Sequence, residues 1–352
     1  MAKVTSRDVA RLAGCSQTTV SLALNNRYDI SISEEMRKRV FDAAKELNYT
    51  PNQFAKGLKT NKSNLIGLIV PNITNPFFSM LIYEMENYAY TKDYNIITCI
   101  SYRQPEIEMA KHRLLTEKSV DGIIYTFTPS PESKDNITSL SKKTRLLIYG
   151  ESDPDTSLDI VCYDGRNEGY LLAKHLLSLG HKKICYISQP FSPNYLSRIQ
   201  RFKGIQDAMR EYGCEDDLIT EAAEIPLSGN SIPTEFEVGY RFAEKVLKDR
   251  SVTAIIGMND MIALGAMNYI QNHTSLSIPG DISICGFDDI YLGNLFHPSL
   301  TTVNHNLHQG CQIAIDTLLD IIKNGRTRQY RKYDYTSQLI VRNSSGPAKN
   351  HI

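Results

Sequence analysis

The chain lacks the long apolar runs that a membrane protein needs. No apolar stretch approaches the ~20 residues that cross a bilayer, and the N-terminus has no signal-peptide h-region. Apolar residues make up 41% and charged residues 22% of the 352 residues, as in soluble globular proteins. These features predict a cytoplasmic protein of two or three domains that does not partner a membrane.

The cysteines lack the spacing of a metal site or of a disulfide framework. All seven are scattered, and no two form a CxxC pair. They indicate buried thiols in a reducing compartment, so no cofactor and no metal is expected. His305 and His308 have no third ligand in sight and are expected on a helix or loop surface.

Signatures of common enzymes are also missing. The chain contains no GxGxxG, no GxxxxGK[ST] and no GxSxG. Dinucleotide binding, P-loop phosphate chemistry and a nucleophile elbow therefore have no support. The sequence predicts a protein that is not an enzyme.

A net charge of zero hides a difference between two parts of the chain. Residues 1–62 hold eleven Lys/Arg and six Asp/Glu, a balance of +5, which leaves a balance of −5 on the other 290 residues. A small basic segment joined to a larger acidic body suits DNA binding confined to that segment. Chance clustering of so few charges is the alternative.

The stretch from Val4 to Asn26 begins with the pattern of a short capped helix. Thr5 is placed to cap it, and Val9, Leu12 and Ala13 recur at the spacing of one apolar face. Gly14 permits the left-handed turn that ends such a helix.

A second short helix follows after the turn. Ser16 is placed as its N-cap, and Val20, Ala23 and Leu24 form its buried stripe. The remaining positions at its N-terminal end are exposed: Gln17, Thr18, Ser21 and Leu22. Two short helices around a Gly-containing turn are typical of a DNA-reading helix-turn-helix, with an ordinary αα-hairpin as the alternative. A third helix, capped by Ser33 and running from Glu34 to Leu47, would complete a headpiece over residues 1–50.

Residues 51–63 are too polar to bury and too few to fold alone, so they are predicted to link two domains. Phe54, Ala55 and Leu58 would share a helix face, although Gly57 weakens a free helix by ~1 kcal/mol. A helix that forms only when docked is the expectation. Leu58, beside Lys59, resembles an apolar wedge for the minor groove, with a solvated linker as the alternative.

From residue 64 to 345, short apolar runs alternate with helical stretches. This rhythm occurs twice, which predicts an α/β body of two doubly wound parallel-sheet lobes. Lobe 1 is expected at about 64–163 and 290–325, and lobe 2 at about 164–289 and 326–345.

Polar and aromatic residues follow the apolar runs, where ligands of open α/β sheets bind. Carboxylates accept hydrogen bonds from hydroxyl groups, and aromatic rings cover the apolar face of a sugar. Singly, each of these residues reads as a turn residue, and only their joint placement favours a polyhydroxylated ligand. They include Asn72, Asn75, Phe77, Phe78, Asp164, Gln189, Asn259, Asp260, Asp288 and Asp289.

Together these motifs resemble the LacI/GalR family of bacterial transcriptional regulators over nearly the whole chain. The most specific matches are Ala13-Gly14, Thr19-Val20-Ser21, Leu47-Asn48-Tyr49-Thr50-Pro51-Asn52, Asn75-Pro76-Phe77-Phe78, Arg201-Phe202-Lys203-Gly204, Gly286-Phe287-Asp288-Asp289 and Leu300-Thr301-Thr302-Val303.

The resemblance implies a helix-turn-helix headpiece, a hinge helix and a periplasmic-binding-protein-like body. It further implies a homodimer on palindromic operator DNA, at the nucleoid of a bacterial cytoplasm, with a small effector between the lobes. The implied DNA-binding residues are Thr5, Ser16, Gln17, Thr18, Thr19, Ser21, Leu22, Asn25, Asn52, Ala55, Leu58 and Lys59. The implied effector-binding residues are Phe77, Phe78, Asp164, Arg201, Asn259 and Asp288.

Several alternatives stay open for the effector. Sugar-binding members of the family keep a set like Arg201, Asn259 and Asp288. The resemblance therefore favours a sugar or sugar phosphate, and hence a repressor of carbohydrate-utilisation genes, over a purine or nucleoside. A protein corepressor docked on the body is a further possibility. A free-standing sugar-binding protein is more remote, because it would carry a signal peptide and no basic headpiece.

Overall fold

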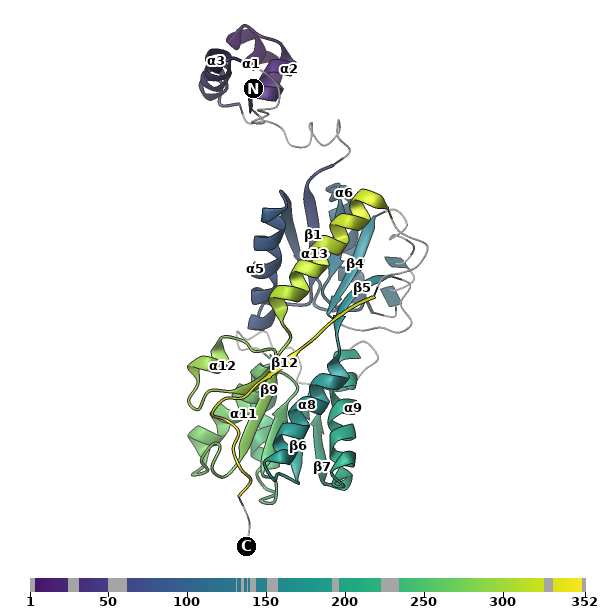
Figure 1. Cartoon of the computed structure of the whole chain (residues 1–352), viewed down its shortest axis with the longest axis vertical. Helices are drawn as coiled ribbons and strands as arrows, with labels where there is room; N and C mark the ends of the chain where they lie inside the picture. The colour runs from purple at the N-terminus through teal and green to yellow at the C-terminus, as the bar shows by residue number, and fades with distance from the viewer. Residues whose placement is uncertain are drawn as a thin grey trace. The chain divides into compact units, whose positions relative to one another are not determined.

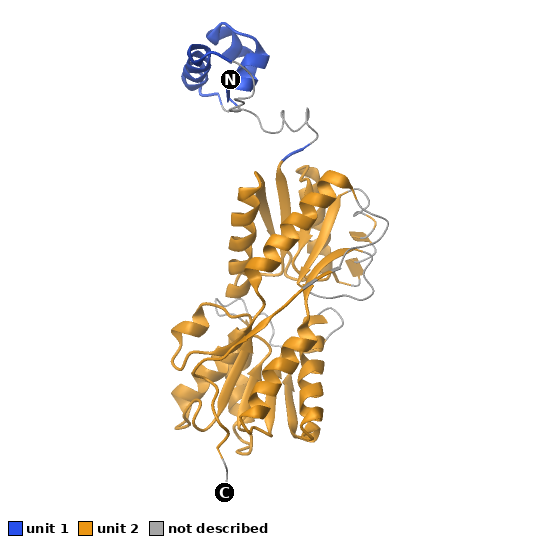
Figure 2. Ribbon diagram, viewed as in Figure 1, with its two compact units in different colours: residues 1–63 blue, residues 64–352 orange. Residues whose placement is uncertain are grey.

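The computed structural model describes residues 4–24, 32–49, 62–130, 132–133, 136–137, 139, 144–150, 158–191, 196–222, 234–325 and 332–349. The chain divides into two compact units, residues 1–63 and 64–352, coloured blue and orange in Figure 2. Within the described ranges, no helix is both long enough and apolar enough to span a bilayer.

The N-terminal unit contains three short helices whose ends are set by local side chains. They are α1 (Ser6–Ala13), α2 (Gln17–Leu24) and α3 (Glu34–Glu46). The Thr5 N–H and hydroxyl donate to the Asp8 carboxylate at 3.0 and 2.7 Å, and Ser16 Oγ accepts from the Thr19 N–H at 3.1 Å. Gly14 adopts φ = 63°, the left-handed conformation predicted for the turn.

The core of this unit is built mainly from small side chains. Its buried residues are Val9, Ala10, Ala13, Val20, Ala23, Val40, Ala43 and Ala44. Leu12, which the pattern predicted on the buried face, is 47% exposed, because Ala10 occupies that face instead. Arg37 and Arg39 of α3 donate to the carbonyls of Ala23 at 3.2 Å and Ala13 at 2.6 Å, so α3 also caps the ends of α2 and α1.

The C-terminal unit contains two six-stranded sheets, as the alternating pattern predicted. The first has the order β11-β5-β4-β3-β1-β2, and every pair in it is parallel. Its strands are β1 (Leu65–Val70), β2 (Asn95–Ile100), β3 (Gly122–Tyr125), β4 (Arg145–Gly150), β5 (Asp159–Tyr163) and β11 (Lys332–Tyr335).

The second sheet has the order β12-β10-β9-β8-β6-β7. Its strands are β6 (Ile184–Ser188), β7 (Leu218–Ala222), β8 (Ala254–Gly257), β9 (Ser283–Phe287), β10 (Thr301–Asn304) and β12 (Gln338–Ile340). Only the edge pair β10–β12 is antiparallel among these described strands.

Helices cover both sheets (Figure 1). In the first lobe, α13 packs on α5 and on β4 and β5, whereas α6 packs on β1 and β2. In the second lobe, α8 pairs with α9, and α10 pairs with α11. Their bounds are α5 (Pro76–Thr91), α6 (Pro105–Glu117), α8 (Gly165–Ser178), α9 (Leu196–Glu211), α10 (Thr234–Val246), α11 (Asp260–His273), α12 (Leu292–Leu295) and α13 (Leu307–Asn324), with the short 3-10 helix η1 at Glu215–Asp217.

The chain crosses between the two sheets at other places than the sequence predicted. Residues 290–304 belong to the second lobe, because β10 pairs with β9, and residues 332–335 belong to the first, because β11 pairs with β5. The expected boundaries at 290 and 326 were therefore wrong. β10 and β11 have four residues each and no long apolar run, so the sequence pattern did not reveal them.

The pairing of α8 with α9 depends on two glycines at the point of closest approach. A Cβ on Gly169 would lie 2.0 Å from the Arg201 carbonyl oxygen, and one on Gly204 would lie 1.8 Å from that of Arg166. Only glycine lets the two backbones approach so closely. The contact sets the distance between Glu168 on α8 and Arg201 on α9.

We expect Gly204→Ala to destabilise the protein by about 1–3 kcal/mol, because the added methyl group must push one backbone away from the other. Gly165→Ala is the matched control, since its Cβ would meet Gln200 Cβ at an ordinary 3.5 Å. Urea unfolding of both variants measures the difference. A Gly204→Ala protein as stable as the Gly165→Ala protein would contradict the packing argument.

Candidate functional sites

The second helix of the N-terminal unit presents a polar surface at its N-terminal end. Gln17, Thr18 and Ser21 are exposed and Leu22 is half-buried, whereas Val20 on the opposite side is buried. Gln17 Nε2 donates to Ser6 Oγ at 3.3 Å, a contact between α2 and α1. The exposed residues of α2 therefore lie where the helix-turn-helix pattern placed them.

Three other predicted DNA-binding residues also serve the helix ends. Thr5 and Ser16 cap α1 and α2, and Thr19 Oγ1 lies 2.9 Å from Ser16 Oγ. The predicted residues Asn25, Asn52, Ala55, Leu58 and Lys59 lie outside the described residues.

In the C-terminal unit, the aromatic pair predicted at the first sheet lies at the start of α5. Asn75 Oδ1 accepts from the Phe77 N–H at 3.0 Å and so fixes the first turn. The Phe77 and Phe78 rings meet edge to face, with centroids 5.2 Å apart. Phe77 also contacts the ring of His305 edge to face, with centroids 5.6 Å apart. His305 directly follows β10 of the second lobe, so this contact connects the Phe77–Phe78 pair to that lobe.

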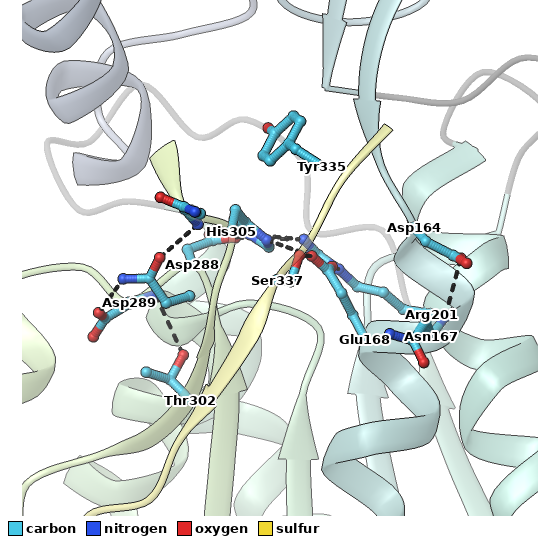
Figure 3. A network of polar contacts seen from close by, with 12 residues as sticks. Asp164, Asn167, Glu168, Arg201, Asp288, Asp289, Thr302, His305, Tyr335 and Ser337 are labelled. Atoms are coloured by element: carbon cyan, nitrogen blue, oxygen red, sulfur yellow. Dashed lines mark hydrogen bonds and ion pairs between the residues drawn. The ribbon is translucent and has the colours of Figure 1, made fainter. Parts of the chain in front are cut away.

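Two of the predicted effector residues act as helix caps. Asp164 Oδ1 accepts from the N–H groups of Arg166 at 3.0 Å and Asn167 at 3.1 Å, and its carboxylate faces the start of α8 (Figure 3). Asn259 Oδ1 accepts from the Ile262 N–H at 3.0 Å at the start of α11. Asp164 is exposed and Asn259 is buried.

The structure brings the other two, Arg201 and Asp288, together in a buried polar network. Arg201 Nη2 lies 3.6 Å from Asp288 Oδ1, and Arg201 Nη1 donates to the Met258 carbonyl at 2.9 Å. The guanidinium also lies over the Phe287 ring, 4.6 Å from its centroid. Arg201 is 5% exposed, so its charge is held inside the protein.

Two residues that the sequence did not place at this site, Glu168 and His305, complete the network (Figure 3). Glu168 Oε2 accepts from Arg201 Nε at 3.3 Å, and Glu168 Oε1 accepts from His305 Nδ1 at 2.7 Å. His305 Nε2 donates to Asp288 Oδ1 at 2.9 Å. Two carboxylates and two cations therefore pair with one another, and such pairing is what a low-dielectric interior requires of buried charges.

The placement of His305 contradicts the sequence prediction. It is 1% exposed, whereas His308 is on the surface as predicted and pairs with Glu84 at 2.8 Å. Tyr163 stacks on the His305 ring with centroids 4.5 Å apart. The prediction failed because His305 follows β10, a strand that the sequence pattern did not reveal.

A signal for Glu168 was present in the sequence. It lies four residues before Leu172 and eight before Leu176, on the buried face of α8. A charged residue on an otherwise apolar helix face has to be paired, so it marks a site worth inspecting.

Glu235, in the first turn of α10, is a further carboxylate that sequence reasoning missed. Asn75 of the first lobe, Arg198 and Asp288 are its electrostatic neighbours. Burial raises the pKa of its carboxyl group. Glu235 therefore lies close to Asn75, the residue before α5.

The network changes the titration of its members. Burial disfavours the charged form of His305, but the carboxylates of Glu168 and Asp288 outweigh it and raise the pKa to about 9. Arg201 Nη2 lies 3.1 Å from His305 Nε2, and this nearby cation opposes the rise. Burial would raise the pKa of Glu168, yet His305 and Arg201 hold it below its ordinary value.

A neighbouring carboxyl group holds the loop that carries Asp288. Asp260 accepts from Thr302 Oγ1 at 2.6 Å and from the Ile290 N–H at 2.9 Å. Burial, and next the charge of Asp288, raise its pKa well above the ordinary value. The backbone here is constrained, since Asp288 has φ = 112° and Asp289 has φ = 51°.

Within the described parts of the chain, no group of three or more His, Cys, Asp or Glu side chains is arranged to hold a metal ion.

We expect His305 to stabilise the protein most at low pH. Its folded pKa of about 9 exceeds the ordinary value of 6.5, so its contribution is complete below pH 6.5 and is lost as pH rises through 9. Between pH 6.5 and 8.5 the stabilisation by His305 falls by about 2 kcal/mol. At higher pH the cysteine thiols of the unfolded chain titrate as well and add a pH dependence of their own. Denaturant unfolding of wild type and His305→Gln tests this, because the variant should lack that part of the pH dependence. Equal pH dependence in both proteins would rule out a charged His305.

Comparison with known proteins identifies both units. A family model described as "Bacterial regulatory proteins, lacI family" matches residues 5–52. A second, described as "Periplasmic binding proteins and sugar binding domain of LacI family", matches residues 63–340, more than half of the chain.

Similar proteins are repressors rather than enzymes. The chain is 32% identical over 345 residues to the HTH-type transcriptional repressor PurR of Haemophilus influenzae (strain PittEE), with 97% of this chain and 98% of that protein covered. It is 33% identical over 349 residues to the repressor of the same name from Aliivibrio salmonicida (strain LFI1238), with the same coverage.

Two solved structures extend the comparison. A LacI family transcriptional regulator from Enterococcus faecium with bound ribose has a TM-score of 0.69 and 29% identity, covering 81% of this chain and 100% of that one. The lac repressor dimer bound to operator and the anti-inducer ONPF shares the fold, with a TM-score of 0.83, 23% identity and coverage of 98% and 100%. The chain belongs to the LacI family of bacterial transcriptional regulators, with a DNA-binding N-terminal unit and an effector-binding body.

Proposed function

We propose that this regulator is a homodimeric repressor of a palindromic operator, and that a small polar effector between its lobes controls operator affinity. The observation that carries the effector site is the buried pair of Arg201 and Asp288 beside the Phe77 ring system. A carboxylate and a guanidinium can bind the donors and acceptors of one ligand, and aromatic rings can cover its apolar face.

We propose a sugar or sugar phosphate as the effector. Carboxylates accept hydrogen bonds from hydroxyl groups, and the Asp288 carboxylate lies 2.9 Å from His305, whose ring contacts Phe77. The ribose bound to the Enterococcus faecium regulator supports this choice. Phe77, Phe78, Asp164, Arg201, Asn259 and Asp288 are the proposed contacts, with Asp164 and Asn259 acting partly through their helix caps.

A purine base or nucleoside is the second candidate. It is favoured by the PurR repressors, which match 97% of the chain at 32–33% identity. A purine also offers N–H donors to Asp288 and ring atoms to Phe77, so the same groups could bind it.

For DNA recognition we propose that Gln17, Thr18 and Leu22 contact base edges in the major groove. Thr5, Ser16 and Thr19 would fix the N-terminal unit against phosphates, since they lie at the N-terminal ends of α1 and α2. Ser21, exposed further along α2, is a further proposed phosphate contact. The partial apolar surface of Leu22 suits a thymine methyl group.

Gln17→Ala should weaken binding to the best operator by about 1–3 kcal/mol and relax preference at one base pair in each half-site. The operator is obtained by selection from random duplexes with the full-length protein, and affinities are compared at one salt concentration. Asp42→Ala, at an exposed position on α3, is the control and should leave the preference unchanged. Uniform weakening across all sequences would mark Gln17 as a phosphate contact.

Asp288→Asn should weaken effector binding by about 10- to 100-fold, because a charged hydrogen bond contributes about 1.5–3 kcal/mol. Calorimetry with D-ribose, cellobiose, glucose 6-phosphate, adenine and guanine identifies the ligand class in the wild-type protein. Asp316→Asn is the control, since Asp316 is half-exposed on α13 and bonds Tyr88 at 2.7 Å. Binding of a purine but of no sugar would favour the second candidate, and unchanged affinity in Asp288→Asn would refute the site.

A further inference from the structure

Along the described residues, the polypeptide crosses between the two sheets of the body three times. The first crossover joins β5 to α8 between Tyr163 and Gly165, and the second joins β10 to α13 between Asn304 and Leu307. The third joins β11 to β12 between Tyr335 and Gln338. A change in the angle between the lobes has to be absorbed by the backbone of these segments.

One carboxylate group contacts two of these segments, and it belongs to the helix that follows the remaining one. Glu168 is 0% exposed and lies one turn into α8, immediately after the first crossover. Its Oε1 accepts from His305 Nδ1, in the second crossover, at 2.7 Å. The same oxygen accepts from Ser337 Oγ, in the third crossover, at 2.5 Å, as the yellow strand crossing Figure 3 shows.

The other oxygen of Glu168 connects these segments to the proposed effector contacts. Oε2 accepts from Arg201 Nε at 3.3 Å, and the His305 ring that bonds Glu168 also donates to Asp288 at 2.9 Å. A ligand donor at Asp288 would compete with His305 Nε2 for the same carboxylate. A change at Asp288 would therefore alter the contact between His305 and Glu168.

We propose that Glu168 is a positioning residue that holds the second and third crossovers to α8, the helix after the first crossover, and transmits effector binding at Asp288 and Arg201 to the angle between the lobes. The transmission rests on the proposed function, because it takes Asp288 and Arg201 as effector contacts. The holding of the crossovers rests on the contacts of Glu168 alone.

Glu168 differs in this respect from Glu84, which forms a second Glu–His pair among the described residues of the body. Glu84 and His308 also form a 2.8 Å contact, between α5 and α13, but both residues belong to the first lobe and His308 is exposed. Glu84→Gln makes the same chemical change as Glu168→Gln outside the crossovers. It is therefore the matched control.

The first experiment needs no ligand. Hydrogen exchange of the full-length protein, read by mass spectrometry, should be at least about tenfold faster at residues 304–307 and 335–338 in Glu168→Gln. Exchange in β8 and β9 should stay slow, and Glu84→Gln should match wild type throughout. Unchanged exchange at both crossovers in Glu168→Gln would overturn the proposal.

If Glu168→Gln gives no cooperative thermal transition and therefore does not fold, Ser337→Ala replaces it in the exchange experiment. It removes one donor and keeps the charge set of Glu168, His305, Arg201 and Asp288 intact. Exchange should then accelerate at residues 335–338 more than at 304–307. Wild-type exchange at 335–338 in this variant would equally overturn the proposal.

The second experiment measures coupling. Operator affinity is determined with and without whichever of D-ribose, cellobiose, glucose 6-phosphate, adenine or guanine binds the wild type most tightly. Glu168→Gln should bring the ratio of the two affinities at least fivefold closer to one, and Glu84→Gln should preserve it. A purely structural role would lower the melting temperature but leave this ratio unchanged, and that result would refute the transmission.

The two experiments separate the two claims. If none of the five compounds binds wild type, the proposed effector class fails, and the exchange experiment still decides whether Glu168 holds the crossovers.

Discussion

The body of this regulator depends on the need to pair charges that are removed from water. Arg201, Glu168, His305 and Asp288 are each at most 7% exposed in their side chains, and each contacts at least one group of opposite charge. A buried charge that loses its partner is strongly destabilising, so these four residues have to move as a set. They come from α8, from α9, from the loop after β9 and from the segment after β10, and their pairing therefore fixes how those elements meet.

Packing prepares the position of each member. The glycine contact between α8 and α9 lets Glu168 reach Arg201, and Asp260 holds the strained backbone that carries Asp288. The Tyr163 and Phe77 rings enclose His305. The buried polar network thus depends on tight helix packing in the second lobe. It also depends on the aromatic rings of the first lobe that pack against His305. A ligand that competes for Asp288 acts on groups that are already coupled to both lobes.

Local chemistry explains which features could be predicted from the sequence. The caps at Ser16 and Ser33 and the left-handed turn at Gly14 depend on neighbouring residues only, and all three were confirmed. The two-lobed α/β body was also predicted correctly from the periodic apolar runs, and the family was predicted correctly from the ordered motifs.

Tertiary context explains what the sequence could not predict. Glu168 and His305 are 137 positions apart, and nothing in the local pattern of either indicates the other. β10 and β11 are too short to produce a clear apolar run, so the places where the chain changes lobe were misassigned. Leu12 was expected in the core, but α1 turns Ala10 inward instead and leaves Leu12 47% exposed, an orientation set by how α1 packs on the other two helices.

The most direct test of the account is whether effector and operator affect each other's binding reciprocally. Calorimetry would measure the dissociation constant of the bound compound for the full-length protein, alone and saturated with the selected operator. Thermodynamic linkage requires this constant to change by the same factor as the operator affinity, typically about 5- to 150-fold. The account predicts that match. Equal constants with and without operator would contradict it, because the site between the lobes would then have no influence on DNA binding.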